Sequence, residues 1–236
     1  MKENAGQDKD ALIRFFSMDI LELAARTAIY FIPFLFALCF HEYSHGMMAK
    51  LRGDNTAEMM GRLSMNPIVH MDFLGTLVLP LLAIGFGSPI FFGWARPVPV
   101  NSRNLRNPRV DMFWIALAGP LSNIFLATVG AFVIGLVVRF APGWEYAKAL
   151  VTLFNTFILI NLYLAIFNLL PINPLDGGKV LARFLPASIN YKLEQNEQML
   201  SMILMFLMLS GALRFLSIPV LWSHEMLMHL ALGKVF

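Results

Sequence analysis

Residues 27–49, TAIYFIPFLFALCFHEYSHGMMA, form an apolar stretch in which His41, Glu42 and His45 are the acidic, basic or histidine residues. About 20 apolar residues in a helix cross the ~30 Å hydrocarbon core of a bilayer, so this stretch predicts a transmembrane helix. At 3.6 residues per turn, His41 and His45 lie about 40° apart on one helix face. Both imidazoles can therefore reach one metal ion.

The composition of the whole chain fits a membrane protein. Of its 236 residues, 58% are hydrophobic and 14% are charged, too few polar side chains to cover a soluble globule. Further windows without any charged residue or histidine cover 73–95, 112–138 and 149–175, and a last apolar window covers 199–222 with Arg214 inside it. We therefore predict an all-α polytopic membrane protein with about four full transmembrane helices and no nucleic-acid partner.

The window 73–95 differs from the other apolar windows because glycine and proline interrupt it. Such a stretch is a poor continuous helix, since both residues destabilise helix interiors. It predicts a re-entrant or broken hairpin, flanked by short extended segments at 61–67 and 94–101. The interrupting residues are Gly75, Pro80, Gly85, Gly87, Pro89 and Gly93.

The basic residues predict the orientation. Segments 50–66, 96–111 and 176–197 hold ten of the eighteen lysines and arginines, whereas 139–148 holds two. If the three basic segments are cytoplasmic, the positive-inside rule is met and the first helix runs inward. This topology requires 67–95 to enter and leave on one side, and it places the basic N-terminal tail outside, against the rule. The ten residues are Lys50, Arg52, Arg62, Arg96, Arg103, Arg106, Arg109, Lys179, Arg183 and Lys192.

The domain organisation is expected to be simple. Residues 1–19 predict an interfacial N-terminal segment, 20–222 a single intramembrane domain, and 223–236 a C-terminal interfacial segment. The N-terminus lacks the apolar core and cleavage site of a signal peptide, so we expect insertion without cleavage. The single cysteine, Cys39, predicts a small apolar packing residue.

A catalytic zinc site needs more than the two histidines. Zinc bound by three protein ligands keeps one position open for water, and Glu42 beside the first histidine suits a general base. Asp176 is the first acid after window 149–175, where Pro171 and Pro174 interrupt the helix. The alternative role of Asp176 is a helix cap. Asp72 is the competing ligand, although the setting of Asp72 at the hairpin entrance favours an interfacial residue or a cap.

Other polar residues in the apolar windows have less specific patterns. Asn123 offers an amide that could bond a neighbouring helix or a substrate, and Asn155 and Asn161 are typical of polar contacts between helices. His224 and His229 are five residues apart, about 140° around a helix, so they should diverge.

Three motifs together resemble those of the site-2 protease family of intramembrane zinc metalloproteases. The resemblance covers about residues 20–195. The small bacterial members of this family have segments similar to 61–67 and 92–100. Domains of the PDZ or CBS type, and the helix that precedes the first motif in some members, have no counterpart here, so gating and regulation cannot be transferred. The motifs are His41-Glu42-x-x-His45, Ala118-Gly119-Pro120-x-x-Asn123 and Asn168-x-x-Pro171-x-x-x-x-Asp176-Gly177.

The resemblance implies a function and a set of site residues. His41, His45 and Asp176 would bind zinc, Glu42 would activate water, and Asn168 would hold the substrate or the oxyanion. The expected substrates are transmembrane proteins or peptides, cleaved at the cytoplasmic side of a bacterial cytoplasmic membrane in regulated intramembrane proteolysis or peptide clearance. The alternatives are a non-proteolytic membrane zinc-binding protein and an ion pathway, for which polar residues should be spread along the helices rather than converge.

Overall fold

The structure, a computed structural model, describes residues 19–86 and 93–233. These ranges are mainly helical and contain no β-strand; their β contact is an isolated antiparallel bridge between Met71 and Ala95. Four of the described helical segments are long and apolar enough to cross a membrane. The predicted all-α polytopic fold class is therefore confirmed.

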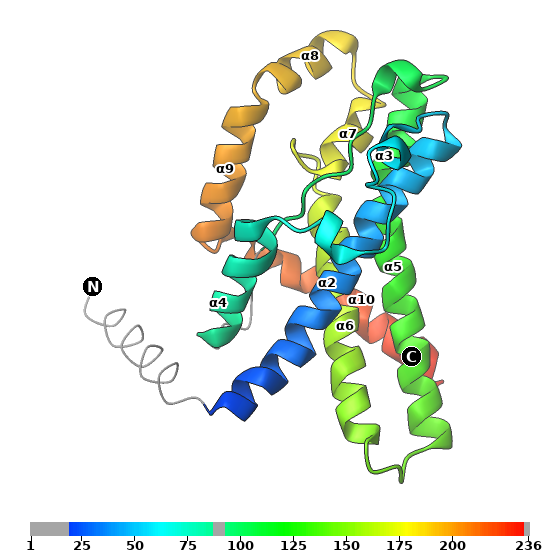
Figure 1. Cartoon of the computed structure of the whole chain (residues 1–236), viewed down its shortest axis with the longest axis vertical. Coiled ribbons are helices and arrows are strands. Elements are labelled where there is room, and N and C mark those ends of the chain that lie inside the picture. The colour runs from blue at the N-terminus through cyan, green and yellow to red at the C-terminus, as the bar shows by residue number, and fades with distance from the viewer. Residues whose placement is uncertain (1–18, 87–92, 234–236) are drawn as a thin grey trace, which may run out of the picture.

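Three long helices form the centre of the bundle (Figure 1). They are α2 (Ile20–Leu51), α5 (Pro108–Phe140) and α6 (Ala147–Asn168), and α5 packs against both of the others. With 32 and 33 residues, α2 and α5 are each about 50 Å long at 1.5 Å per residue. Both exceed the ~30 Å hydrocarbon core, so their ends project from it.

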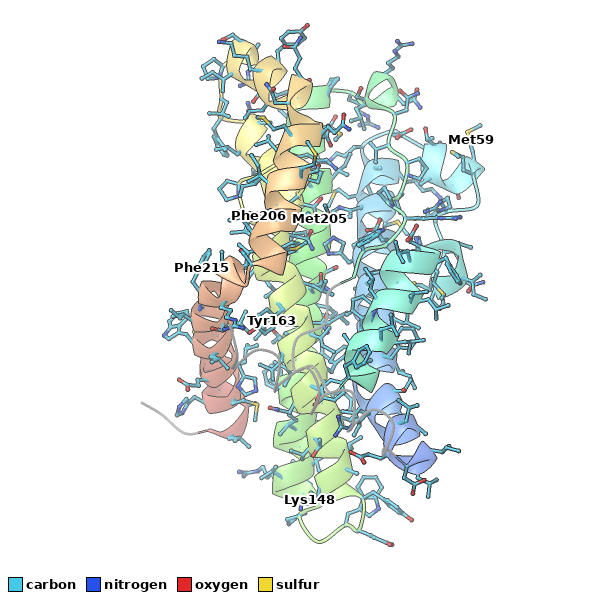
Figure 2. The ribbon with its side chains drawn as sticks, turned by 90° about the vertical axis from the view of Figure 1, so that its left-hand side faces the viewer. Met59, Lys148, Tyr163, Met205, Phe206 and Phe215 are labelled. Carbon is cyan, nitrogen blue, oxygen red and sulfur yellow. The ribbon has the colours of Figure 1, made fainter. Side chains whose placement is uncertain are left out.

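Three of the short helices gather at one end of the bundle. Helices α3 (Thr56–Met59), α7 (Asp176–Ala182) and α8 (Ala187–Gln195) lie at the end opposite the loop that joins α5 to α6 (Figure 1). Figure 2 shows Lys148, near the start of α6, at the lower end and Met59 of α3 toward the upper end. The three segments rich in lysine and arginine are therefore brought to the same end of the molecule.

The chain between α3 and α5 folds back on itself. Trp94 donates its backbone N–H to the carbonyl of Gly75 (3.2 Å), and Arg96 donates to the carbonyl of His70 (2.8 Å). Together with the Met71–Ala95 bridge, these bonds place the two ends of the segment side by side. The two ends of the predicted hairpin therefore meet, and re-entry into the membrane from one side stays a prediction for this hairpin. Its helical arm consists of η1 (Pro67–Val69), the π-helix η2 (Phe73–Val78) and α4 (Leu79–Gly85).

The last apolar window does not form one helix. The structure divides this part of the chain into α9 (Glu197–Leu209), η4 (Ala212–Leu216) and α10 (Ser217–Leu232). The chain breaks at Gly211, whose φ of 73° is left-handed, a conformation that glycine adopts at little cost. The predicted span at 199–222 is therefore wrong, because the membrane-length segment is 212–232. The expected boundary at 222 falls inside α10, and residues 1–18 lie outside the described part.

α10 packs closely against α5 and α6. Gly135 of α5 makes this approach possible, because a Cβ there would lie 2.5 Å from the carbonyl oxygen of Ala231. Small residues commonly allow such contacts between transmembrane helices. The buried core where the three helices meet consists of Ala127, Ala131, Ile134, Ile158, Leu162 and Val220.

Asp54 connects the turn after α2 to the segment that leads into α5. Its side chain is fully buried, and its carboxylate accepts hydrogen bonds from the backbone N–H of Thr56 and Asn101 and from the side-chain amide of Asn104. Burial alone would raise the pKa of Asp54, but these hydrogen bonds and that of the Thr56 hydroxyl outweigh it and hold the pKa below its ordinary value. Asp54 thus stabilises η3 (Ser102–Asn104) against α2.

We expect Asp54 to make stability depend on acid pH. Because its folded-state pKa is lowered, its contribution is complete above the unfolded value of about 3.9 and is lost as the pH falls through the lower folded-state pKa. Asp54→Asn should lower the apparent Tm at neutral pH by about 3–10 °C and weaken its dependence on acid pH. Thermal unfolding in detergent micelles measures both. Asp19→Asn, at an exposed aspartate, should change neither; a Tm unaffected by Asp54→Asn would contradict the prediction.

Candidate metal site

The two histidines of α2 face the inside of the bundle, as their spacing predicts. The exposed fractions of His41 and His45 are 6% and 8%, and their Nε2 atoms are 3.0 Å apart. The Nδ1 atom of His45 donates to the backbone carbonyl of Ile115 on α5 (2.6 Å). The Nδ1 atom of His41 bonds the side-chain oxygen of Asn123, also on α5 (2.6 Å). Each ring is thus held at Nδ1, and each Nε2 atom points toward the other.

The turn after α6 brings an acid to these nitrogens. Asp176 is the first residue of α7, is 8% exposed, and places its Oδ2 atom 3.2 Å from Nε2 of His41 and 3.1 Å from Nε2 of His45. The next residue must be glycine, because a Cβ at Gly177 would lie 2.2 Å from the carbonyl oxygen of Leu170. Leu175 occupies the N-cap position of α7, whereas the carboxylate of Asp176 contacts His41 and His45. Its geometry is therefore that of a metal ligand rather than a cap.

The competing acid has the other role. Asp72 precedes the π-helix of the hairpin, and its carboxylate accepts hydrogen bonds from the backbone N–H of Leu74 (3.1 Å) and Gly75 (2.8 Å). These are the unsatisfied donors that an N-terminal cap supplies with an acceptor. The interpretation of Asp72 as a cap is confirmed.

The three ligand atoms fit a zinc ion. They form a triangle with sides of 3.0, 3.1 and 3.2 Å, and tetrahedral ligands with zinc bonds of 2.0–2.1 Å are about 3.3 Å apart. Two imidazoles and a carboxylate are also the ligand types that zinc takes, with a fourth position left for water. Among the described residues, this is the group of histidine, cysteine and acid side chains whose ligand atoms converge.

Gly119 of α5 leaves the space beside these atoms open. A Cβ at Gly119 would lie 2.3 Å from Nε2 of His45 and 2.6 Å from Nε2 of His41. Any other residue would therefore occupy the space next to the nitrogens that face Asp176. The sequence did contain Gly119 within the Ala118-Gly119-Pro120-x-x-Asn123 motif, but the motif alone does not show which atoms this glycine faces.

Gly119→Ala should weaken zinc binding by at least about tenfold, comparable to the loss of a residue that orients a ligand. The added methyl group must displace one or both imidazole rings, since its contacts would be shorter than real carbon atoms allow. Competition with a chromogenic chelator measures the zinc Kd of the purified protein. Gly143→Ala is the matched control, because a Cβ at Gly143 meets nothing within 4 Å. Equal zinc affinity in the two variants would contradict this explanation.

Glu42 lies next to the triangle but makes a different contact. Its Oε2 atom accepts a hydrogen bond from the backbone N–H of Val98 (2.9 Å), in the segment that leaves the hairpin. Arg62 holds the same segment, donating to the carbonyls of Arg96 (2.9 Å) and Pro97 (3.3 Å). The carboxylate of Glu42 is therefore fixed beside the site. Sequence reasoning did not find this contact, because a backbone N–H has no sequence signal.

The remaining predicted residues are placed differently. Asn168 is the last residue of α6, is partly exposed, and donates its amide to the carbonyl of Leu164 (2.9 Å). Asn123 is fully buried behind His41, and both atoms of its amide are bonded to protein groups. These are bonds to neighbouring helices, one of the two roles predicted for Asn123, and its role in substrate binding stays a prediction. His224 bonds Asn155 of α6 (2.7 Å), the predicted kind of polar contact between helices.

Comparison with known proteins places the chain in a family. The sequence profile of Peptidase family M50 matches residues 137–211. YwhC of Bacillus subtilis (strain 168), named as a zinc metalloprotease, is 39% identical over 170 residues, which cover 70% of this chain and 73% of YwhC. The chain belongs to peptidase family M50. Rip2 of Mycolicibacterium smegmatis, which carries a similar name, is 30% identical over 180 residues, covering 76% of this chain and 66% of Rip2.

A further relative matches a shorter part of the chain. MJ0611 of Methanocaldococcus jannaschii is 50% identical over 68 residues, which cover 28% of this chain and 31% of MJ0611. No solved structure matches the chain significantly. Membership of M50, the site-2 protease family, confirms the resemblance found in the motifs. Together with the four candidate spans, it makes this chain an integral membrane zinc metalloprotease.

Proposed function

We propose that this M50 protease hydrolyses peptide bonds within or next to the transmembrane segments of membrane proteins. His41, His45 and Asp176 would hold the zinc ion, and Glu42 would be the general base. The observation that carries the proposal is the convergence of three buried ligand atoms within 3.2 Å, next to a fixed glutamate. A pure zinc-binding protein has no use for such a base beside its first ligand.

The proposed reaction divides the work among the side chains. When bound, zinc supplies a Lewis acid that polarises a carbonyl oxygen and lowers the pKa of water toward neutrality. Glu42 takes a proton from the attacking water as the new C–O bond forms, and passes it to the nitrogen as the C–N bond breaks. Asn168 would donate its amide to the carbonyl oxygen of the substrate, where negative charge develops. This requires it to leave the carbonyl of Leu164.

The depth of the site supports an intramembrane substrate. His41 is 14 residues beyond Thr27, where the apolar stretch of α2 begins, and this corresponds to about 21 Å along the helix axis. The site would thus lie inside a ~30 Å hydrocarbon core, in the half nearer the last residue of α2. Because the segments rich in lysine and arginine lie at this end, the positive-inside rule favours the cytoplasmic side. A bacterial cytoplasmic membrane is the proposed location.

A transmembrane helix must unwind before it can be cut, because its carbonyls are held in helical hydrogen bonds. An extended segment of the protein could hold the unwound substrate as an added strand. Within 96–99, the N–H groups of Arg96 and Val98 are engaged by His70 and Glu42, and residues 97 and 99 are prolines. Docking there would therefore require the Glu42–Val98 bond to open.

The proposal predicts metal-dependent cleavage in a bilayer. Purified protein in proteoliposomes should cut members of a panel of single-span substrates, lose this activity with a zinc chelator, and regain it when zinc is added back. Mass spectrometry of the products should place the cut within or next to the apolar segment. Zinc bound at the site without cleavage of any substrate would favour the non-proteolytic alternative. Cleavage that continues after complete zinc removal would contradict both the proposed function and the non-proteolytic alternative.

A further inference from the structure

Two fully buried asparagines lie behind the candidate metal site. Asn123 belongs to α5 and Asn161 to α6, and the exposed fraction of each is 0%. The amide nitrogen of Asn123 bonds the amide oxygen of Asn161 (2.9 Å), and the amide oxygen of Asn123 bonds Nδ1 of His41 (2.6 Å). A continuous chain of hydrogen bonds thus connects α6 to a metal-ligand candidate on α2.

The direction of this chain follows from backbone carbonyls, which only accept hydrogen bonds. The nitrogen of Asn161 donates to the carbonyl of Phe157 (2.8 Å), so its oxygen faces Asn123 and accepts. The nitrogen of Asn123 also donates to the carbonyl of Ala37 (3.1 Å). The oxygen of Asn123 is therefore the atom that faces His41, and Nδ1 of His41 must carry a proton.

This polarity decides what His41 can bind. A neutral imidazole with its proton on Nδ1 has a bare lone pair on Nε2, and a metal ligand needs that lone pair. His45 reaches the same state directly, since its Nδ1 atom donates to the carbonyl of Ile115. For His41, this protonation state depends on the side-chain amide of Asn123. That amide can rotate by 180°, which would place its donor nitrogen where its acceptor oxygen now lies. Asn161 is one of the two groups that keep the amide of Asn123 in the required orientation.

We infer that Asn161 is a positioning residue for zinc binding, acting on His41 through Asn123. The inference rests on the proposed function, because it takes His41 as a zinc ligand. Without Asn161, the amide of Asn123 loses one of its two acceptors, and its flipped form would donate to Nδ1 of His41. The proton of His41 would then move to Nε2, where it blocks the metal. Polar groups that orient a metal-binding histidine typically change metal affinity by about 10–100-fold when they are lost.

The test compares three variants of α6 by metal binding rather than by activity. Asn161→Leu should weaken zinc binding by about 10–100-fold and alter the visible absorption of the cobalt-substituted protein, which reports ligand geometry. Asn161→Asp keeps an acceptor toward Asn123 and should bind zinc nearly as tightly as the wild type. Asn155→Leu is the matched control, because it removes a hydrogen bond between α6 and α10 that does not lead to the site.

The outcomes separate this inference from the proposed function. Unchanged zinc affinity in Asn161→Leu would overturn the inference, as would equal weakening in Asn155→Leu, which would indicate a general effect on the bundle. If Asn161→Leu is not recovered as folded protein, Asn161→Ala is measured by the same criteria. Zinc binding that persists in the double variant His41→Ala and His45→Ala would instead overturn the proposed metal site.

Discussion

Glu42→Gln should lower kcat/KM for peptide cleavage by about 10²–10⁴-fold and leave the zinc content unchanged. The ligand triangle consists of His41, His45 and Asp176, so removing the charge of Glu42 removes no ligand. Glutamine keeps the shape of the side chain and an oxygen that can accept the hydrogen bond from Val98. It cannot take a proton from water, which is the role assigned to the carboxylate.

Two measurements on the same preparation check this result. Zinc is determined in the purified variant, and cleavage is followed with single-span substrates in proteoliposomes. Glu22→Gln is the matched control, because Glu22 lies on the same helix but pairs with Arg26 at an exposed position; it should change neither quantity. Cleavage by Glu42→Gln at the wild-type rate would remove Glu42 as the base. Loss of zinc in this variant would show that Glu42 has a structural role at the site.

Much of the fold could be predicted because the membrane limits what a chain can do. Stretches without charge predicted the helices that became α2, α5 and α6, since lipid leaves the backbone few alternatives. The density of glycine and proline within 73–95, together with the requirement that both ends lie on one side, predicted the hairpin that the Met71–Ala95 bridge closes. Both predictions use properties of whole segments, which a single sequence contains.

The break between α9 and α10 could not be found in this way. Hydropathy treats 199–222 as one apolar run, whereas the path of the chain is decided by the left-handed backbone at Gly211. Nothing in the apolar pattern distinguishes this glycine from one that stays helical. The span consequently lies about ten residues later than expected, and residues 223–232 belong to it.

The site shows a similar division between local and distant information. His41 and His45 share one helix, so their spacing was enough to predict a common face, and Glu42 is the neighbour of His41 in the sequence. Asp176 comes from another helix, so its prediction required its position as the first acid after window 149–175 and a resemblance to a family. Asn161 followed a generic pattern of polar contact between helices, and its link to His41 through Asn123 exists only in three dimensions.

Asp176→Ala should abolish stable zinc binding, with a loss of affinity greater than the roughly 10–100-fold typical of residues that only orient a ligand. The variant leaves two imidazoles, and two protein ligands do not complete the usual three of a catalytic zinc site. The N-cap position of α7 is Leu175 rather than Asp176, so removal of the Asp176 side chain should not unfold α7. Cleavage should be lost together with zinc.

Asp72→Ala provides the matched comparison, because Asp72 is the other acid considered as the third ligand. Asp72 caps the π-helix of the hairpin, so its removal should lower the free energy of unfolding by about 0.5–2 kcal/mol, the amount typical of a lost cap, and leave zinc affinity unchanged. We therefore expect Asp176→Ala to lose zinc affinity and keep its stability, and Asp72→Ala to keep zinc affinity and lose stability. Full zinc binding by Asp176→Ala, with zinc lost from Asp72→Ala, would reverse the assignment of ligand and cap. Among the described residues, Asp176 is the acid whose carboxylate oxygen converges with the nitrogens of His41 and His45. The reversal would therefore also require the hairpin, which carries Asp72, to move toward α2.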